Sequence, residues 1–456
     1  MTDPLNIGTT PGNSLAIKST DCSLTYAELN ELVHRQVQYL ESFPDGLLIL
    51  GFSPDIDSVV TYLAALHSDR SIMLIDPKSS NLVVRVMIDT FRPTLLGGIY
   101  GVDSKILTVV DSSNCTTPKS LVFLPTSGST GSAKMVRLPV SAVTANASSI
   151  SQVLKLTSGH VAPLNLPLFY SYGLSILNSH LSAGACVTLS GQNFMESTFW
   201  KNFDTWGCTS LAGVPVNYAM LKRLKFDPRE HPSLTCMTQA GGRLPIDLQM
   251  HFHGLMEDVG GQFFIMYGQT EASARMAVLP HADFLAKKGS VGYAIPGGRF
   301  KILNDENIEV GMNNVGNVVY SGPNVMQGYS ESAEDVAQGD IMRGTLETGD
   351  LGYLDEDDCL WITGRTKRIA KIFGTRVNLD DVEEMSHTRG FSVAAIPGDD
   401  RLILIVEGLN KNSGLRKELA RELGVHHSGI EEHLMESLPL LPSGKRDYAQ
   451  LMKLFS

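Results

Sequence analysis

Apolar residues in the long N-terminal part of the chain follow two alternating spacings. Leu24–Leu40 (LTYAELNELVHRQVQYL) places them at helical intervals, and Thr25 is suited to cap that helix. The short apolar runs Leu47–Phe52 and Ser71–Ile75 predict strands, with a helix over Asp55–Ser68 between them. Further strands are expected at residues 120–124, 187–189, 211–214 and 263–266. This strand–helix–strand rhythm predicts an α/β fold with parallel sheets.

The pattern changes at about Lys301. Short strands separated by Gly and Asn turns (FKILNDENIEVGMNNVGNVVYSG) predict a small β-rich subdomain. After Arg365 the chain has its own strand–helix–strand pattern and ends in a segment with Pro and Gly. We therefore expect a large N-terminal domain of parallel and mixed sheets with helices and a small β-rich subdomain, followed by a small α+β C-terminal domain.

Composition narrows the class of protein. A chain of 456 residues is long enough for roughly two to four domains. The 43% hydrophobic and 19% charged content is that of a globular protein with a large core, and the net charge of −11 argues against a general nucleic-acid or membrane-surface binder. The six cysteines form no C-x-x-C pair, which indicates reduced thiols. Without an apolar run of membrane-span length or a secretory signal, we expect a cytoplasmic protein.

The stretch LPTSGSTGSAKMVRLP (Leu124–Pro139) directly follows an expected strand, Ser120–Leu124. It has little side chain to bury, and its hydroxyls, glycines and free N–H groups are suited to a concave anion site, with Lys134 adding positive charge. The Walker A spacing is absent, and a flexible Gly/Ser surface turn is the alternative. The residues expected to hold phosphate are Thr126, Ser127, Gly128, Ser129, Thr130, Gly131 and Lys134.

The stretch Tyr267–Glu271 (YGQTE) follows another expected strand. In α/β folds ligands bind at the carboxyl ends of parallel strands, where Tyr267 can stack on a base and Gly268 lets a ligand approach the backbone. Glu271 is a hard oxygen ligand suited to Mg²⁺. Gly241–Gly242 lies one strand earlier and can border the same pocket.

Three later stretches also carry candidate chemistry. Thr348–Asp350 places a carboxylate after a tight turn, suited to two ribose hydroxyls. Gly364–Arg376 carries five basic residues in an acidic chain, and Pro439–Lys445 (PLLPSGK) offers a lysine on a Pro/Gly loop. Each stretch taken alone also fits an ordinary structure: a turn, a solvated charged face or a terminal tail.

The ordered set of motifs resembles the ANL superfamily of adenylate-forming enzymes, which comprises acyl- and aryl-CoA synthetases, adenylation domains of nonribosomal peptide synthetases and beetle luciferases. The resemblance covers nearly the whole chain, and the motifs occur in family order. The stretches that carry it are TSGSTGSAK, LPLFYSYGLS, QAGGRLP, YGQTE, GSVGYAIPG, ETGDLGYLD, GRTKRIAKIFGTRVNLDDVEE and LPSGK.

The resemblance implies that ATP and Mg²⁺ are used to join a small carboxylic acid to AMP with release of pyrophosphate. The acyl group then passes to the pantetheine thiol of CoA or of an acyl carrier protein. It further implies an N-terminal domain at residues 1–364, a hinge at 365–367 with Lys367 as hinge residue, and a mobile C-terminal domain at 368–456 that alternates between two poses.

By the same resemblance, Lys445, Glu271 and Thr270 are expected to be catalytic, with Lys445 bridging the acid and the α-phosphate. Glu271 is the expected metal ligand, and Lys371 and Gly374 are expected to act in thioester formation. The other expected nucleotide contacts are Gly241, Gly242, Arg243, Tyr267, Gly268, Asp350 and Arg365. The expected acid pocket contains Tyr170, Ser171, Gly173 and Val214.

This chain departs from the family pattern at one position of the expected acid pocket, which narrows the class of substrate. Two alternative functions stay open. Peptide-synthetase adenylation domains place an aspartate where this chain has Tyr170, and a tyrosine cannot pair with an α-amino group. This argues against an ordinary α-amino acid as substrate. A standalone adenylation enzyme for an amino acid or amine-bearing acid remains one alternative. A catalytically silent nucleotide-binding scaffold is the other, although the presence of Lys445 and Glu271 argues against it.

Overall fold

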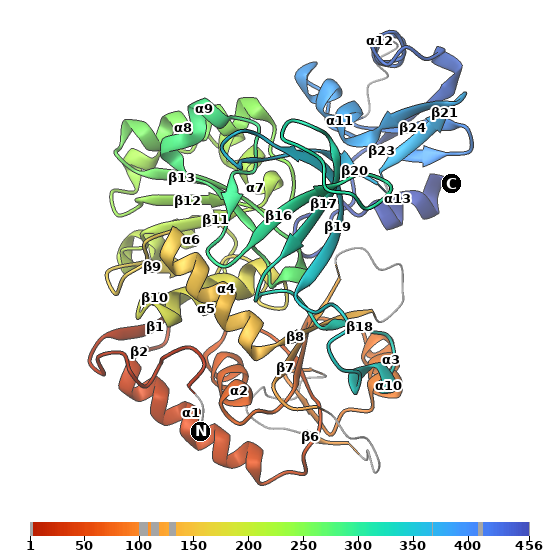
Figure 1. Cartoon of the computed structure of the whole chain (residues 1–456). Coiled ribbons are helices and arrows are strands. Elements are labelled where there is room, and N and C mark those ends of the chain that lie inside the picture. Colours follow the sequence, from red (N-terminus) through yellow and green to blue (C-terminus); the bar gives the residue numbers. More distant parts are fainter. Residues whose placement is uncertain are drawn as a thin grey trace.

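The structure is a computed structural model that describes residues 3–99, 108–110, 118–126, 134–366, 368–408 and 414–455. Several sheets with covering helices make up the long N-terminal part, and a smaller α+β unit lies at the C-terminal end (Figure 1). This is the predicted fold class. Among the described helices, none combines the length and the apolar composition needed to cross a membrane.

The first sheet has seven strands and carries the expected strand that precedes the phosphate loop. Its strands β4, β3 and β5 are parallel, β4 also pairs in parallel with β7, and β7 turns back antiparallel into β8. Its order is β18 (Gly328–Ser330), β8 (Met135–Pro139), β7 (Leu121–Pro125), β4 (Ile72–Ile75), β3 (Leu48–Gly51), β5 (Leu95–Gly97) and β6 (Thr108–Val109).

The predicted N-terminal helix begins two residues later than its apolar pattern. Residues 23–25 pair with the preceding strand, and α1 (Tyr26–Glu41) starts only after them. Thr25 is its N-cap, as predicted, and forms a capping box with Glu28. The helix α2 (Ile56–His67) is capped by Asp55 and is buried on almost every side, as a helix that is apolar all round must be.

The second sheet positions the candidate site. Its first three strands are parallel and the last two are antiparallel, so the carboxyl ends of β11, β12 and β13 meet at one edge. Its strands are β11 (Ser210–Gly213), β12 (Cys236–Gln239), β13 (Gln262–Tyr267), β14 (Ala277–Leu279) and β15 (Tyr293–Ala294). The helices α6 (Ser197–Trp206), α7 (Pro215–Arg223), α8 (Ile246–Asp258) and α9 (Phe284–Lys287) belong to the same region.

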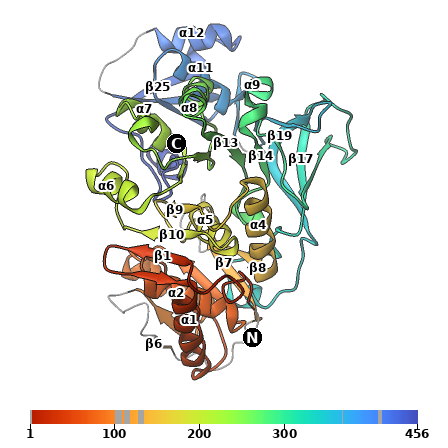
Figure 2. The ribbon, with the colours of Figure 1, turned by 90° about the vertical axis from the view of Figure 1, so that its left-hand side faces the viewer.

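Two packed helices fill the space between the first and second sheets. Figures 1 and 2 both show α4 (Val140–Val153) and α5 (Ser171–Ser182) between the strands β7–β8 and the strand β13. All of α5 except its last residue is buried, including polar side chains, so this helix forms part of the interior next to the site. A further sheet contains β2 (Ser23–Thr25), β1 (Leu15–Ser19), β10 (Cys186–Leu189) and β9 (Val161–Pro163).

The expected β-rich subdomain is an antiparallel sheet that begins at Arg299. Its strands are β16 (Arg299–Leu303), β17 (Gly316–Ser321), β19 (Thr345–Leu354) and β20 (Leu360–Arg365). The short helices α3 (Asn81–Phe91) and α10 (Ala333–Val336) contact each other beside the first sheet.

The C-terminal part has hydrophobic clusters of its own, formed by residues from Ala370 onward. It contains the hairpin β21 (Ile369–Ile372) and β22 (Thr375–Asn378), and the sheet β23 (Val393–Gly398), β24 (Arg401–Glu407) and β25 (Ile430–Met435). Its helices are α11 (Leu379–Thr388), α12 (Leu415–Glu422) and α13 (Tyr448–Phe455). The domain division at residues 365–367 stays a prediction.

Candidate active site

The loop after β12 brings Gly241 against Tyr170 and Lys445. A Cβ atom at Gly241 would lie 2.6 Å from Tyr170 Oη and 3.4 Å from Lys445 Cε, and the backbone there has a φ of +85°. Only glycine satisfies both conditions. Tyr170 comes from the N-terminus of α5 and Lys445 from the last loop of the chain, so three expected site residues from distant segments meet at this point.

Lys445 reaches the site through a tight turn. The Leu441 N–H donates to the Lys445 carbonyl over 2.7 Å, and Gly444 allows a φ of +77° where a Cβ would lie 2.9 Å from Val214 Cγ2. The Lys445 Nζ lies 5.1 Å from the centre of the Tyr170 ring. Burial and the field of Arg365 lower the pKa of Lys445 to about 8, although Glu271 acts in the opposite direction.

Asp350 is the centre of a group of residues expected to bind the nucleotide. Its buried carboxylate pairs with Arg365 Nε at 2.8 Å and accepts a hydrogen bond from the Tyr267 hydroxyl. Gln269 Nε2 also donates to it over 2.9 Å and to the Thr348 carbonyl over 2.8 Å. Burial and Asp350 raise the pKa of Tyr267 well above its usual value. Gln269 was not predicted as a site residue from the YGQTE motif, because its role depends on partners in the β-rich sheet.

A second group links the phosphate loop to Glu271. Strand β18 pairs with β8, which brings Tyr329 beside Lys134: the Lys134 Nζ lies 3.8 Å from the centre of the Tyr329 ring. The Tyr329 hydroxyl donates to Glu271 Oε1 over 2.8 Å. Tyr329 was not predicted as a site residue, because no motif marks a residue that reaches the site through strand pairing.

Glu271 and Thr270 lie next to each other on a 3₁₀ turn after β13. Thr270 is buried, and its hydroxyl lies 3.1 Å from the Ser171 hydroxyl. A carboxylate flanked by a hydroxyl is the hard oxygen set that suits Mg²⁺. The residues present therefore fit a magnesium ion bound together with phosphate.

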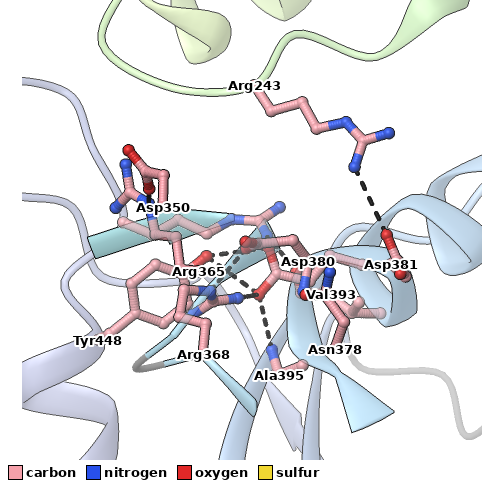
Figure 3. A network of polar contacts seen from close by, with 12 residues as sticks. Arg243, Asp350, Arg365, Arg368, Asn378, Asp380, Asp381, Val393, Ala395 and Tyr448 are labelled. Carbon is pink, nitrogen blue, oxygen red and sulfur yellow. Dashed lines mark hydrogen bonds and ion pairs between the residues drawn. The ribbon is translucent and has the colours of Figure 1, made fainter. Parts of the chain in front are cut away.

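Several expected residues have a packing role or a different partner in this structure. A Cβ at Gly173 would lie 2.2 Å from the Pro167 carbonyl oxygen, so glycine is required for the close approach of α5 to the preceding loop. A Cβ at Gly242 would lie 3.2 Å from Pro215 Cγ. Arg243 points to α11, where its guanidinium lies 3.6 Å from Asp381 (Figure 3).

Figure 3 shows a second polar network, on the C-terminal side of Arg365. Arg368 pairs with Asp380 at 2.6 Å and with Glu383 at 2.7 Å. Glu383 also pairs with Arg446 at 2.8 Å and accepts hydrogen bonds from Tyr448 Oη at 2.9 and 3.0 Å. One carboxylate therefore ties the segment after the expected hinge to the residues that follow Lys445.

The structure does not bring the expected thioester-forming residues to Lys445. Lys371 is exposed on β21, and Gly374, with a φ of +86°, has open space around it at the turn of the hairpin. Figure 1 shows β21 on the outer side of the C-terminal part, away from β12 and β13. The expected role of Lys371 and Gly374 in thioester formation stays a prediction.

Some expected residues lie outside the described part of the chain. Thr126 and Lys134 border the expected phosphate loop and are described. The Thr126 N–H donates to the Lys134 carbonyl over 3.5 Å. The residues outside the described part are Ser127, Gly128, Ser129, Thr130, Gly131 and Lys367.

A separate group, His253, Glu257 and His281, has ligand atoms within 4.8 Å of one another. His281 Nδ1 accepts a hydrogen bond from the Phe263 N–H over 3.1 Å, so its Nε2 carries a proton and donates to Glu257 Oε2 over 2.5 Å. Both ring nitrogens of His281 are thus already used in hydrogen bonds within the protein. We therefore interpret this group as a structural hydrogen-bond relay.

Known proteins resemble the chain in sequence and in fold. A family model described as "AMP-binding enzyme" matches residues 108–330. The oxalate–CoA ligase of Arabidopsis thaliana is 29% identical over 407 residues, 79% of this chain and 77% of that protein. The 4-coumarate–CoA ligase 2 of Narcissus pseudonarcissus is 28% identical over 298 residues, 61% of this chain and only about half (52%) of that protein.

Among solved structures, o-succinylbenzoate CoA synthetase of Bacillus subtilis, in complex with an acyl-adenylate intermediate, superposes with a TM-score of 0.80. The two chains are 20% identical, and the match covers 99% of this chain and 98% of the other. The likeness extends through the β-rich sheet and the C-terminal part, beyond the residues that the family model matches.

Proposed function

The chain belongs to the ANL superfamily of adenylate-forming enzymes, and we propose on that premise that it is an AMP-forming acid–thiol ligase. It joins a carboxylic acid to AMP, releases pyrophosphate, and passes the acyl group to a pantetheine thiol. The observation that carries this proposal is Lys445, which a C-terminal loop places beside Tyr170 and Gly241.

Lys445 supplies the charge that the first step needs. A carboxylate attacking the α-phosphate brings two negatively charged groups together, and an ammonium between them lowers that repulsion as the transition state forms. Lys445 is already held in this region by the turn at Gly444 and by its contact with Tyr170. Little reorganisation is then required when the substrates bind.

The nucleotide is held by the residues that cluster around Asp350 and Lys134. Asp350 accepts the ribose hydroxyls while Arg365 and Gln269 fix its orientation, and Tyr267 lies beside the adenine. Lys134, with the loop that precedes it, holds the phosphates. Glu271 and Thr270 would hold a magnesium ion on those phosphates, which would supply positive charge as pyrophosphate leaves.

The second step uses another pose of the C-terminal domain. Rotation at residues 365–367 withdraws Lys445 and brings the hairpin of Lys371 and Gly374 to the acyl-adenylate. The CoA ligases among the relatives support CoA as the acceptor. An acyl carrier protein carries the same pantetheine thiol and is the alternative acceptor. An assay with each acceptor distinguishes the two.

Pyrophosphate release over a panel of carboxylic acids tests this function directly. We expect ATP- and acid-dependent release, followed by thioester formation when CoA or a phosphopantetheinylated carrier protein is added. An enzyme for amine-bearing acids would release pyrophosphate only with the amino acids in the panel. A silent scaffold would bind ATP and release none.

A further inference from the structure

Arg275 stands at the end of a strained turn next to the site. Ser273 and Ala274 both have left-handed backbones, with φ of 56° and 97°, which is costly for residues other than glycine. A Cβ at Gly268 would lie 1.7 Å from the Ala274 carbonyl oxygen, so the turn also requires that glycine. The Arg275 side chain, which directly follows this turn, lies in the interior with 1% of its surface exposed.

Within the part of the chain that the structure describes, no side chain supplies a counter-charge to the buried guanidinium: Arg275 Nε and Nη1 have no hydrogen-bond partner there, and no carboxylate forms an ion pair with it. Its Cζ lies 5.0 Å from the centre of the Tyr172 ring. Arg137, another fully buried arginine, instead donates to the carbonyls of Gln338, Gln327 and Gly339. Arg137 Nε is also without a partner among the described residues, but both terminal nitrogens of Arg137 bond to backbone carbonyls, whereas Nη1 of Arg275 does not.

Aromatic contacts connect Arg275 to the reacting centre. Tyr172, on which the guanidinium lies, packs edge-to-face with Tyr170 at 6.4 Å between ring centres. The Tyr170 ring in turn lies 5.1 Å from Lys445 Nζ. Lys445 and Arg275 therefore each contact one ring of the same edge-to-face tyrosine pair.

The two tyrosines are not held equally. The Tyr172 hydroxyl donates to Thr238, whose carbonyl lies at 2.9 Å and whose hydroxyl lies at 2.8 Å. The part of the chain that the structure describes offers the Tyr170 hydroxyl no hydrogen bond. Tyr170 is thus the ring that can turn aside for a ligand, while Tyr172 stays as a fixed wall.

We propose that Arg275 is the specificity-determining residue of the acid pocket and pairs with a second carboxylate of the substrate. The substrate class is then a short dicarboxylic acid: one carboxylate reacts beside Lys445, and the other completes the hydrogen bonds of the guanidinium. A guanidinium fork matches a carboxylate in bidentate geometry, which is why arginine suits this role. The inference rests on the proposed ligase function.

The test compares acids that differ only in the second charge. Pyrophosphate release is measured with malonate, succinate and glutarate, with propionate, butyrate and valerate, and with monomethyl succinate. We expect wild-type kcat/KM to favour at least one dicarboxylate over its counterparts without the second charge by about a hundredfold, because an unmatched buried polar group is rejected strongly. Equal or better use of the singly charged acids by the wild-type enzyme would overturn the proposal.

Variants separate recognition from folding. Arg275→Met is expected to lose about a hundredfold in kcat/KM on the preferred dicarboxylate and to leave the monocarboxylate values and the KM for ATP unchanged. Arg275→Lys, which keeps a charge, should retain part of the preference. Arg137→Met is the matched control, since it removes a buried arginine that has backbone partners and should leave the acid preference intact.

The outcomes also separate this inference from the function on which it rests. An enzyme that adenylates no acid in any panel refutes the ligase function itself. An enzyme that adenylates acids but ignores the second carboxylate refutes only the role of Arg275. If Arg275→Met does not fold, the proposal is tested by the wild-type acid panel and by Arg275→Lys. A lysine variant whose preference for the dicarboxylate equals that of the wild type overturns the proposal.

Discussion

The nucleotide side and the acid side of the site differ in how fully their polar groups are paired. Asp350, Arg365, Tyr267 and Gln269 bond to one another before any ligand is bound. On the proposed acid side, the described residues leave two nitrogens of the Arg275 guanidinium and the Tyr170 hydroxyl without a hydrogen bond. In the proposed function, the polar groups are thus preorganised for ATP and left open for the carboxylic acid.

Lys445 stands between the two sides, and its removal gives the largest expected effect. Lys445→Ala should lower adenylation by about a hundredfold or more, because its charge acts mainly in the transition state. Thioester formation from a supplied acyl-adenylate should survive, since that step uses the other domain pose. Separate assays of the two half-reactions measure this difference.

The hinge variant is the complementary test of the same idea. Lys367→Pro should spare adenylation and slow thioester transfer, because proline restricts backbone rotation at that residue. Equal damage to both half-reactions by Lys445→Ala, or none to either by Lys367→Pro, would contradict the alternating poses.

Glu271 tests the phosphate end of the nucleotide side. Glu271→Gln keeps the shape but removes the charge, and ATP–pyrophosphate exchange should fall by about two orders of magnitude. Tyr329→Phe is the control: it removes only the hydrogen bond to Glu271 Oε1 and should cost roughly tenfold or less. Exchange at the wild-type rate in Glu271→Gln would rule out a metal-binding role.

Tyr170 tests whether the two sides are independent. Tyr170→Ala should widen the acid pocket and change relative kcat/KM values among acids by roughly tenfold, the scale of apolar pocket contacts. The KM for ATP should stay within about twofold of the wild-type value, because the Asp350 cluster is untouched. A weakened ATP KM with unaltered acid selectivity would instead place Tyr170 on the nucleotide side.

The smallest expected effect is a pH dependence. The pKa of Lys445 is lowered to about 8 by burial and by Arg365, so the lysine is protonated below that pH and neutral above it. We expect kcat/KM for adenylation to be highest near neutral pH, where Lys445 is protonated. It should fall to about half of that value at pH near 8 and decline further at higher pH. If kcat/KM stays constant up to pH about 10, adenylation does not depend on the protonated form of a lysine with this lowered pKa.

Much of the fold and part of the site could be predicted from local pattern. The apolar spacing located β3, α2, β4 and β13 to within one or two residues, because each element buries a continuous apolar stretch. Thr25 was recognisable as a cap from its hydroxyl and its place before the helix. Tyr329 and Gln269 could not be found in this way, since each acts through a partner distant in the sequence.

The sequence by itself determined the kinds of chemistry available: a hydroxyl- and glycine-rich loop ending at Lys134, carboxylates at Glu271 and Asp350, and a terminal lysine. Those assignments depend only on residue types and on spacings of a few residues, and both are visible in the sequence.

Only the tertiary structure decided which of these groups meet. It placed Lys445 against Tyr170 and Gly241, tied Arg368 to Arg446 through Glu383, and turned Arg275 into the interior, where no described residue supplies a counter-charge. Sequence spacing cannot give such contacts, because they depend on long-range packing between elements and on which buried polar groups the fold leaves unpaired.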